Sequence, residues 1–167
     1  MLFRSQAGDI TPGTTLLAGI RAAVSETTTV RYNPAGEFEG DEALADVGIV
    51  VLDEEPYAEG EGDRADLTLP GADVALLARV RSRCRKLVVI LISGRPLIVT
   101  GHLPQWDAFV AAWLPGTEGQ GIADVLFGDY PFTGKLSFTW PRSMDQIPCD
   151  FQSLGRPLFP FGYGLES

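Results

Sequence analysis

Val47-Gly48-Ile49-Val50-Val51-Leu52 is an almost entirely apolar run, and the acidic, glycine-rich segment Glu55–Asp63 follows it closely. A strand covered on both faces has such a continuous apolar pattern, whereas a strand with one solvated face alternates. The run therefore predicts a buried strand of a parallel sheet. Ligand sites of such sheets lie beyond the carboxyl ends of the strands, where glycines let the backbone approach a ligand. We place the chemistry of the chain in Glu55–Asp63, with a solvated acidic turn as the alternative.

Short apolar runs alternate with helical patterns on both sides of this stretch, which predicts an α/β fold with a mainly parallel, helix-covered sheet. We expect strands at Thr28–Tyr32, Val47–Leu52, Leu87–Ser93 and Phe109–Leu114, helices at Gly13–Ser25, Gly71–Arg85 and from about Pro115 to Phe127, and one or two helical turns at Asp41–Asp46.

The last quarter of the chain has a different composition. Gly134–Pro141 has the pattern of one more strand, but proline, glycine and aromatic residues dominate from Arg142 onward. We therefore expect one domain over residues 1–141 and an irregular arm of the same domain over residues 142–167. The aromatic side chains of the arm require a surface to pack on, either of this domain or of a missing partner.

Composition excludes several classes of protein. The 167 residues carry a formal net charge of −9, which argues against a nucleic-acid surface, and the one basic run, Arg81–Lys86, ends a predicted helix. No apolar run reaches the roughly 18 residues that a membrane-spanning helix needs. Met1–Ser5 does not begin a signal peptide. The two cysteines lack the CxxC spacing of a zinc ribbon.

Familiar catalytic and cofactor motifs are also incomplete, and we expect no cofactor. Gly116–Gly121 resembles a phosphate loop but lacks the Gly-Lys-Ser/Thr ending. Ser93 lacks the Gly-x-Ser-x-Gly context of a serine nucleophile, and His102 is the only histidine. An all-carboxylate cation site remains an alternative, without the residue order of a calcium loop; its ligands would be Glu55, Glu59, Glu61 and Asp63.

Carboxylate chemistry fits these residues best. Glycoside hydrolysis uses two carboxyl groups, about 5–5.5 Å apart in retaining enzymes, and one of them must hold its proton near neutral pH. A glutamate among other acids meets the second requirement, because neighbouring negative charge raises its pKa.

Several motifs occur in an order and at a spacing that resemble the C-terminal α/β-sandwich domain of family-three glycoside hydrolases, the β-glucosidases and exo-β-glucanases. The likeness extends from about Gly8 to the end of the chain. These motifs are Pro56–Asp63, Leu91–Pro96, Ala111–Gly121, Leu126–Asp129, Thr133–Leu136, Phe138–Pro141 and Phe161–Leu165.

The resemblance implies a three-layer α/β sandwich and a retaining enzyme that acts on terminal β-D-glucosyl residues of a β-glucoside or β-glucan. In that family the nucleophile is an aspartate of a preceding (β/α)8 barrel, and a loop of the second domain supplies the acid/base. The matching position here is Glu59, with Glu61 a weaker candidate. Arg95 and Glu118 match family motifs, and we interpret both as structural.

The chain also departs from the family pattern. It contains no barrel, so the resemblance implies an inactive fragment that begins after the first strand of its domain and exposes a sheet edge. Asp53 and Glu55 stand where relatives often carry glycine and histidine. The alternatives are a non-catalytic module that binds glycans or a partner protein, and a flavodoxin-like binder, for which a phosphate loop is missing.

Overall fold

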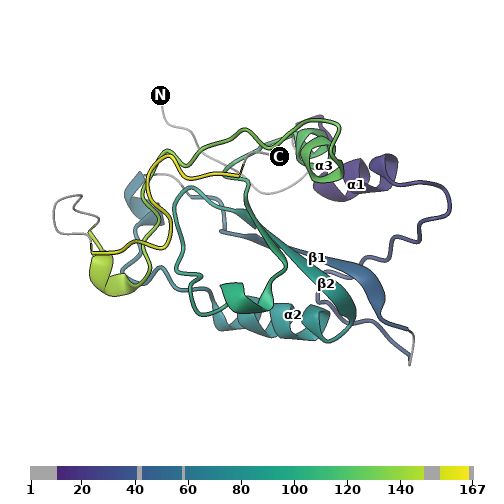
Figure 1. Ribbon diagram of the computed structural model, residues 1–167, viewed down its shortest axis with the longest axis horizontal. Helices are drawn as coiled ribbons and strands as arrows, with labels where there is room; N and C mark the ends of the chain where they lie inside the picture. The colour runs from purple at the N-terminus through teal and green to yellow at the C-terminus, as the bar shows by residue number, and fades with distance from the viewer. Residues whose placement is uncertain (1–10, 41–42, 58, 149–154, 166–167) are drawn as a thin grey trace.

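The computed structural model describes residues 11–40, 43–57, 59–148 and 155–165, and the side chain of Glu59 lies outside this description. The described residues form three helices and three strands in an α/β arrangement (Figure 1). The helices are α1 Leu16–Ala23, α2 Gly71–Arg81 and α3 Gly119–Phe127, and the strands are β1 Ala45–Asp53, β2 Cys84–Ile92 and β3 Ala108–Ala111.

The sheet is parallel, with β2 between β1 and β3. Along the paired strands Val50 lies opposite Val89, and Val89 opposite Phe109. Parallel neighbours require crossover connections, and α2 is the crossover between β1 and β2. The parallel α/β class expected from the sequence is confirmed.

The core lies between the sheet and α2. Val50 and Leu52 of β1 are buried there with Leu77 and Val80 of α2. Successive side chains of a strand point to opposite faces, so Val47 and Val51 point away from α2, and they are 52% and 37% exposed. Figure 1 shows α1 and α3 on the side opposite α2. The exposed valines show that α1 and α3 do not cover this face of β1. The sequence analysis predicts a sheet covered by helices, and at β1 that cover is incomplete.

Four expectations about elements are wrong. Thr28–Tyr32 forms no strand, because none of the described segments pairs with it and β-branched residues need such a partner. The helical turns expected near Asp41–Asp46 are not found at 43–44, and β1 already begins at Ala45. The basic run is divided between the end of α2 and the start of β2. Gly134–Pro141 contributes only an isolated bridge, between Trp140 and Phe159.

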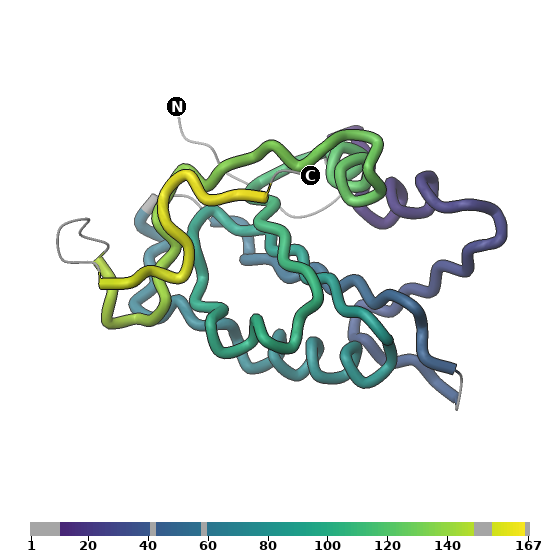
Figure 2. Tube along the Cα trace, in the orientation of Figure 1, coloured from purple at the N-terminus to yellow at the C-terminus, as the bar shows by residue number. Residues whose placement is uncertain are grey.

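The C-terminal arm packs on its own domain. Trp140 is 1% exposed, and its indole N–H donates to the carbonyl of Leu97 at 2.8 Å. Phe109, Trp113 and Phe159 surround it with ring centroids 5.5–6.5 Å away. Figure 2 shows the last described segment, in yellow, running beside an earlier segment in green to yellow-green, and an isolated bridge joins Trp140 to Phe159 there. Residues 149–154 and 166–167 of the predicted arm lie outside the described residues.

No helix among the described residues is long and apolar enough to span a membrane.

An ion pair joins the amino ends of β2 and β3. Asp107 accepts hydrogen bonds from Lys86 Nζ and from the backbone N–H of Leu87, both at 2.8 Å. These bonds stabilise the ionised carboxylate and hold the pKa of Asp107 below its ordinary 3.8.

We therefore expect Asp107→Asn to destabilise the protein at neutral pH and progressively less as pH falls below 3.8. A depressed pKa contributes stability that is present above the unfolded-state value and is lost as pH falls through the folded-state value. Urea unfolding of both proteins from about pH 2.5 to 7 measures the difference across this range. A difference between the two curves that stays constant with pH would contradict the linkage.

Candidate functional site

The site lies at the carboxyl edge of the sheet, where β1, β2 and β3 end. The segment after β1 is Glu54–Arg64, and Ser93–Pro96 follows β2. Trp113 follows β3 with a φ of 54°, an uncommon conformation for a bulky residue, and its carbonyl accepts from the N–H of Ser93 at 3.1 Å. Three connecting segments, one after each strand, therefore meet at the edge where the sequence analysis places the chemistry.

Among the described acidic side chains of the site, Glu54 accepts the most hydrogen bonds. Its side chain is 6% exposed, and Arg95 Nε donates to both of its carboxylate oxygens at 3.0 and 3.2 Å. Arg64 Nη1 donates to Oε1 at 3.1 Å, and the hydroxyl of Tyr57 donates to Oε2 at 3.1 Å. Two guanidinium groups thus pair with one nearly buried carboxylate. We therefore interpret Glu54 as a structural residue and not as a catalytic acid or base.

The ring of Tyr57 links this ion cluster to the following turn. The guanidinium of Arg95 lies 4.4 Å from the centre of the ring. Burial, and next the charge of Glu54, raise the pKa of the Tyr57 phenol above its ordinary value. A Cβ on Gly62 would lie 2.7 Å from Cγ of Tyr57, and one on Gly94 would lie 2.5 Å from its hydroxyl oxygen. Both glycines therefore make room for Tyr57.

Glu59 begins the short 3₁₀ helix η1, Glu59–Gly62. The structure places its backbone at the carboxyl edge of β1, as the sequence predicts, while its side chain is outside the described part. Glu55, Glu61 and Asp63 belong to the same loop, and Glu55 and Asp63 are exposed. Burial, and next the charge of Asp53, raise the pKa of the half-buried Asp73 in the first turn of α2.

The other sequence candidates lie elsewhere or have structural contacts. Ser93 is buried, and its hydroxyl donates to the carbonyl of Arg95 at 2.7 Å. The His102 ring stacks on Trp106 at 6.4 Å. Glu118 is the N-cap of α3, which confirms its position at a helix start. No group of three metal-binding side chains is found among the described residues.

Gly119, within the glycine run at 116–121, serves helix packing. A Cβ on Gly119 would collide with the backbone of Thr15 and Leu16 at the start of α1, and one on Gly19 would lie 3.1 Å from Ala123 Cβ. Gly19 and Gly119 therefore allow α1 and α3 to approach closely, which gives Gly119 a packing role that needs no bound phosphate.

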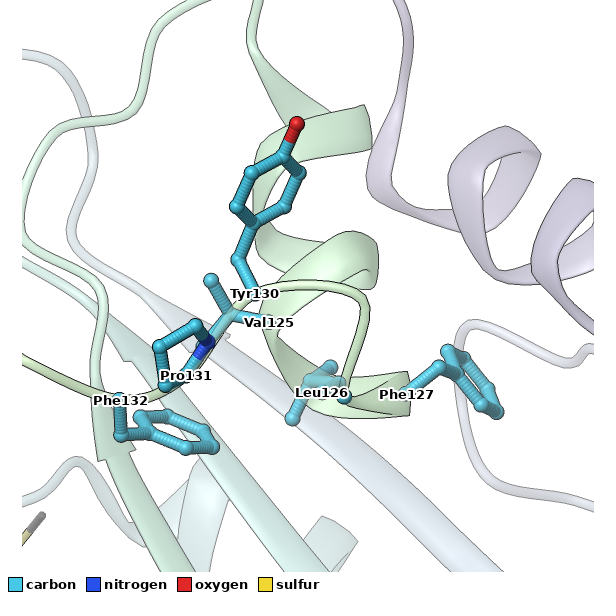
Figure 3. Close-up of a pocket in the computed structure, with 7 residues that line it drawn as sticks. Val125, Leu126, Phe127, Tyr130, Pro131 and Phe132 are labelled. Atoms are coloured by element: carbon cyan, nitrogen blue, oxygen red, sulfur yellow. The ribbon is translucent and has the colours of Figure 1, made fainter. Parts of the chain in front are cut away.

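A separate hollow of about 410 Å³ lies at the end of α3 (Figure 3). The side chains of Phe127 and Tyr130 point in different directions from this segment in Figure 3. The described residues that line the hollow include no carboxylate, imidazole or cationic side chain. Its lining residues are Val125–Gly128 and Tyr130–Phe132.

The sequence did not single out Glu54 or Tyr57 as structural centres of the site. Their partners, Arg64 and Arg95, are 10 and 41 residues from Glu54 along the chain. Tyr57 and Arg95 belong to the motifs Pro56–Asp63 and Leu91–Pro96, whereas Glu54 and Arg64 lie just outside the first of these.

Gly62 and Gly60 offer a matched pair of substitutions within η1. Gly62→Ala is expected to destabilise the protein by about 1–3 kcal/mol, because the new methyl group overlaps the Tyr57 ring. Gly60→Ala meets no atom within 4 Å and is expected to be neutral or stabilising by up to about 1 kcal/mol. Urea unfolding compares the two. Equal effects would show that the Tyr57 ring does not constrain this turn.

Comparison with known proteins extends these observations. Residues 4–167 match the model of the glycosyl hydrolase family 3 C-terminal domain. The chain is 31% identical to a periplasmic β-glucosidase of Salmonella typhimurium, covering 97% of this chain and 28% of that protein. It is 30% identical to a β-xylosidase of Formosa agariphila, over 90% of this chain and 25% of the relative.

Among solved structures, the fold is similar to a variant of the exo-1,3/1,4-β-glucanase ExoP of a Pseudoalteromonas species, with a TM-score of 0.80 and 39% identity. That match covers 92% of this chain and 26% of ExoP, so the chain spans about a quarter of the length of these relatives. The matched family model covers nearly all of the sequence, including the loop after β1 and the aromatic arm. The chain belongs to the glycosyl hydrolase family 3 C-terminal domain family.

Proposed function

We propose that this chain is the acid/base-bearing part of a retaining β-glucosidase or exo-β-glucanase, with Glu59 as the acid/base. The observation that carries the proposal is the position of η1. The sequence motif that contains Glu59 lies at the carboxyl edge of β1, in a turn held by Tyr57 and Glu54.

In the proposed reaction, protonated Glu59 first donates its proton to the departing glycosidic oxygen. A nucleophilic carboxylate forms the covalent glycosyl-enzyme, and ionised Glu59 then removes a proton from the water that releases the sugar. The first step requires a carboxyl group that keeps its proton near neutral pH. The neighbouring acids Glu55, Glu61 and Asp63 of the same loop favour that state, because like charge raises the pKa of a carboxyl group.

The nucleophile of this proposal is an aspartate on a separate (β/α)8 barrel, as the family resemblance implies. The partners are therefore that barrel and a substrate with a terminal β-D-glucosyl residue. The chain alone is expected to have no turnover, because the acid/base Glu59 cannot complete the two-step reaction without a nucleophile positioned against the substrate.

The test combines the chain with the barrel portion of a close family member and measures hydrolysis of aryl β-glucosides and aryl β-xylosides. Glucoside hydrolysis that requires both components supports the proposal, and preferred xyloside hydrolysis would correct the substrate. A combined preparation that stays inactive, while the isolated chain binds glucan in calorimetric titration, would favour the non-catalytic glycan-binding module.

A further inference from the structure

The loop that carries Glu59 is closed on itself by one side chain. Tyr57 precedes η1 and Arg64 follows it, and both donate hydrogen bonds to the carboxylate of Glu54, each at 3.1 Å. Arg64 Nη2 also lies 3.4 Å from the carbonyl of Thr68, at the loop's exit. Glu54 therefore joins the two ends of a loop that closes over a separation of 10 residues.

A second set of contacts fixes this closure to the sheet. The backbone N–H of Glu54 donates to the carbonyl of Ile92 at 3.1 Å, which continues the pairing of β1 with β2. Arg95, just beyond the end of β2, donates to both oxygens of Glu54. Because Glu54 is anchored to β2 by its main chain and its side chain, the loop it closes is anchored as well.

Contact with the Tyr57 ring carries this constraint into η1. The space where a Cβ of Gly62 would lie is filled by the ring, so the last residue of η1 rests directly on Tyr57. The N–H of Asp63 donates to the carbonyl of Gly60 at 3.2 Å and completes the turn. The backbone of η1, which includes Glu59, is thus held by neighbours that contact Glu54.

We propose that Glu54 is a positioning residue that holds η1, and with it the backbone of Glu59, at the carboxyl edge of β1. The inference rests on the proposed function for the role of Glu59 and adds a distinct role for the buried carboxylate that precedes it in the same loop. Both oxygens of Glu54 are occupied by Arg64, Arg95 and Tyr57, so it supports proton transfer without taking part in it.

The first test is hydrogen exchange on the chain itself. Glu54→Gln is expected to accelerate amide exchange in residues 59–63 by at least about tenfold, the loss expected from one charge-assisted hydrogen bond, while α2 and β2 keep their protection. Asp107→Asn is the matched control, because it also removes an ion pair but at the opposite, amino edge of the sheet. It is expected to leave residues 59–63 unchanged.

Arg64→Gln keeps the test valid if Glu54→Gln fails to fold. It removes the loop-closing bond and the contact with Thr68 but leaves Arg95 on Glu54, and the Arg64 side chain is 34% exposed, so a milder effect on stability is expected. Unchanged exchange of residues 59–63 in the folded variant would overturn the proposal.

The second test separates positioning from general loss of structure. In the enzyme assembled with a barrel, Glu54→Gln is expected to lower kcat/KM for substrates with poor leaving groups at least about tenfold more than kcat/KM for activated aryl glucosides. Only the substrates with poor leaving groups depend strongly on the proton donor. Equal losses for both substrates would overturn the proposal. If Glu59→Gln also lacks this selectivity, the proposed function itself fails; if Glu59→Gln has it and Glu54→Gln does not, only the positioning role fails.

Discussion

Replacing Glu59 with Gln is expected to lower kcat/KM of the assembled enzyme by about 10²–10⁴-fold for a β-glucoside with a poor leaving group, the usual contribution of a positioned general acid. Glutamine has nearly the same shape but has no proton to donate at neutral pH. The loss is expected to be much smaller for an activated aryl glucoside, whose leaving group departs without protonation. Steady-state kinetics with a series of leaving groups measures the difference.

Glu61→Gln is the natural comparison for this variant. Glu61 lies in the same 3₁₀ helix and undergoes the same chemical change. We expect it to lose far less activity, with no dependence on the leaving group. The opposite result, with the selective loss in Glu61→Gln, would transfer the acid/base assignment from Glu59 to Glu61.

Trp140→Ala is expected to lower the free energy of unfolding by about 3–5 kcal/mol, the range for truncating a large buried aromatic side chain. Trp140 is 1% exposed and contacts rings from β3, from the segment after β3 and from the arm. Its main chain also pairs with Phe159, whose carbonyl accepts from Trp140 N–H at 2.8 Å. Truncation therefore leaves a cavity where the arm joins the core, and urea unfolding measures its cost.

Two further variants separate the sources of this effect. Trp140→Phe retains a ring but removes the hydrogen bond to Leu97, and it is expected to cost less than the alanine variant. Phe161→Ala removes an aromatic ring of the arm that is 67% exposed, and a change within about 0.5 kcal/mol is expected. Comparable losses in Phe161→Ala and Trp140→Ala would mean that the arm is held by its exposed rings and not by Trp140.

Much of the fold is predictable because local patterns decide it. The apolar positions of α1 and α3 recur at helical spacing, and Thr15 caps α1 by accepting from the N–H of Ala18 at 3.1 Å. The continuous apolar runs of β1 and β2 identify the paired centre of the sheet. These elements carry their own signal within a short stretch of the chain.

Other features depend on partners distant in sequence. Thr28–Tyr32 has the composition of a strand and forms none. Strand formation requires a pairing partner, which composition does not identify. The site shows the same limit. The motif after β1 identifies the loop and Glu59, whereas the role of Glu54 becomes visible only when Arg95 is brought to it from beyond β2.

The close approach of α1 and α3 has a consequence for the order of folding during synthesis. Thr14 bridges to Glu118, and the two helices meet at glycines where no side chain fits. A helix of 8 residues is marginal alone, so α1 gains its stabilising neighbour only after the whole sheet has been translated. The core between α2 and the sheet contains much more local pairing and is expected to assemble first. Of the three helices described, the first to be translated would then be among the last to dock.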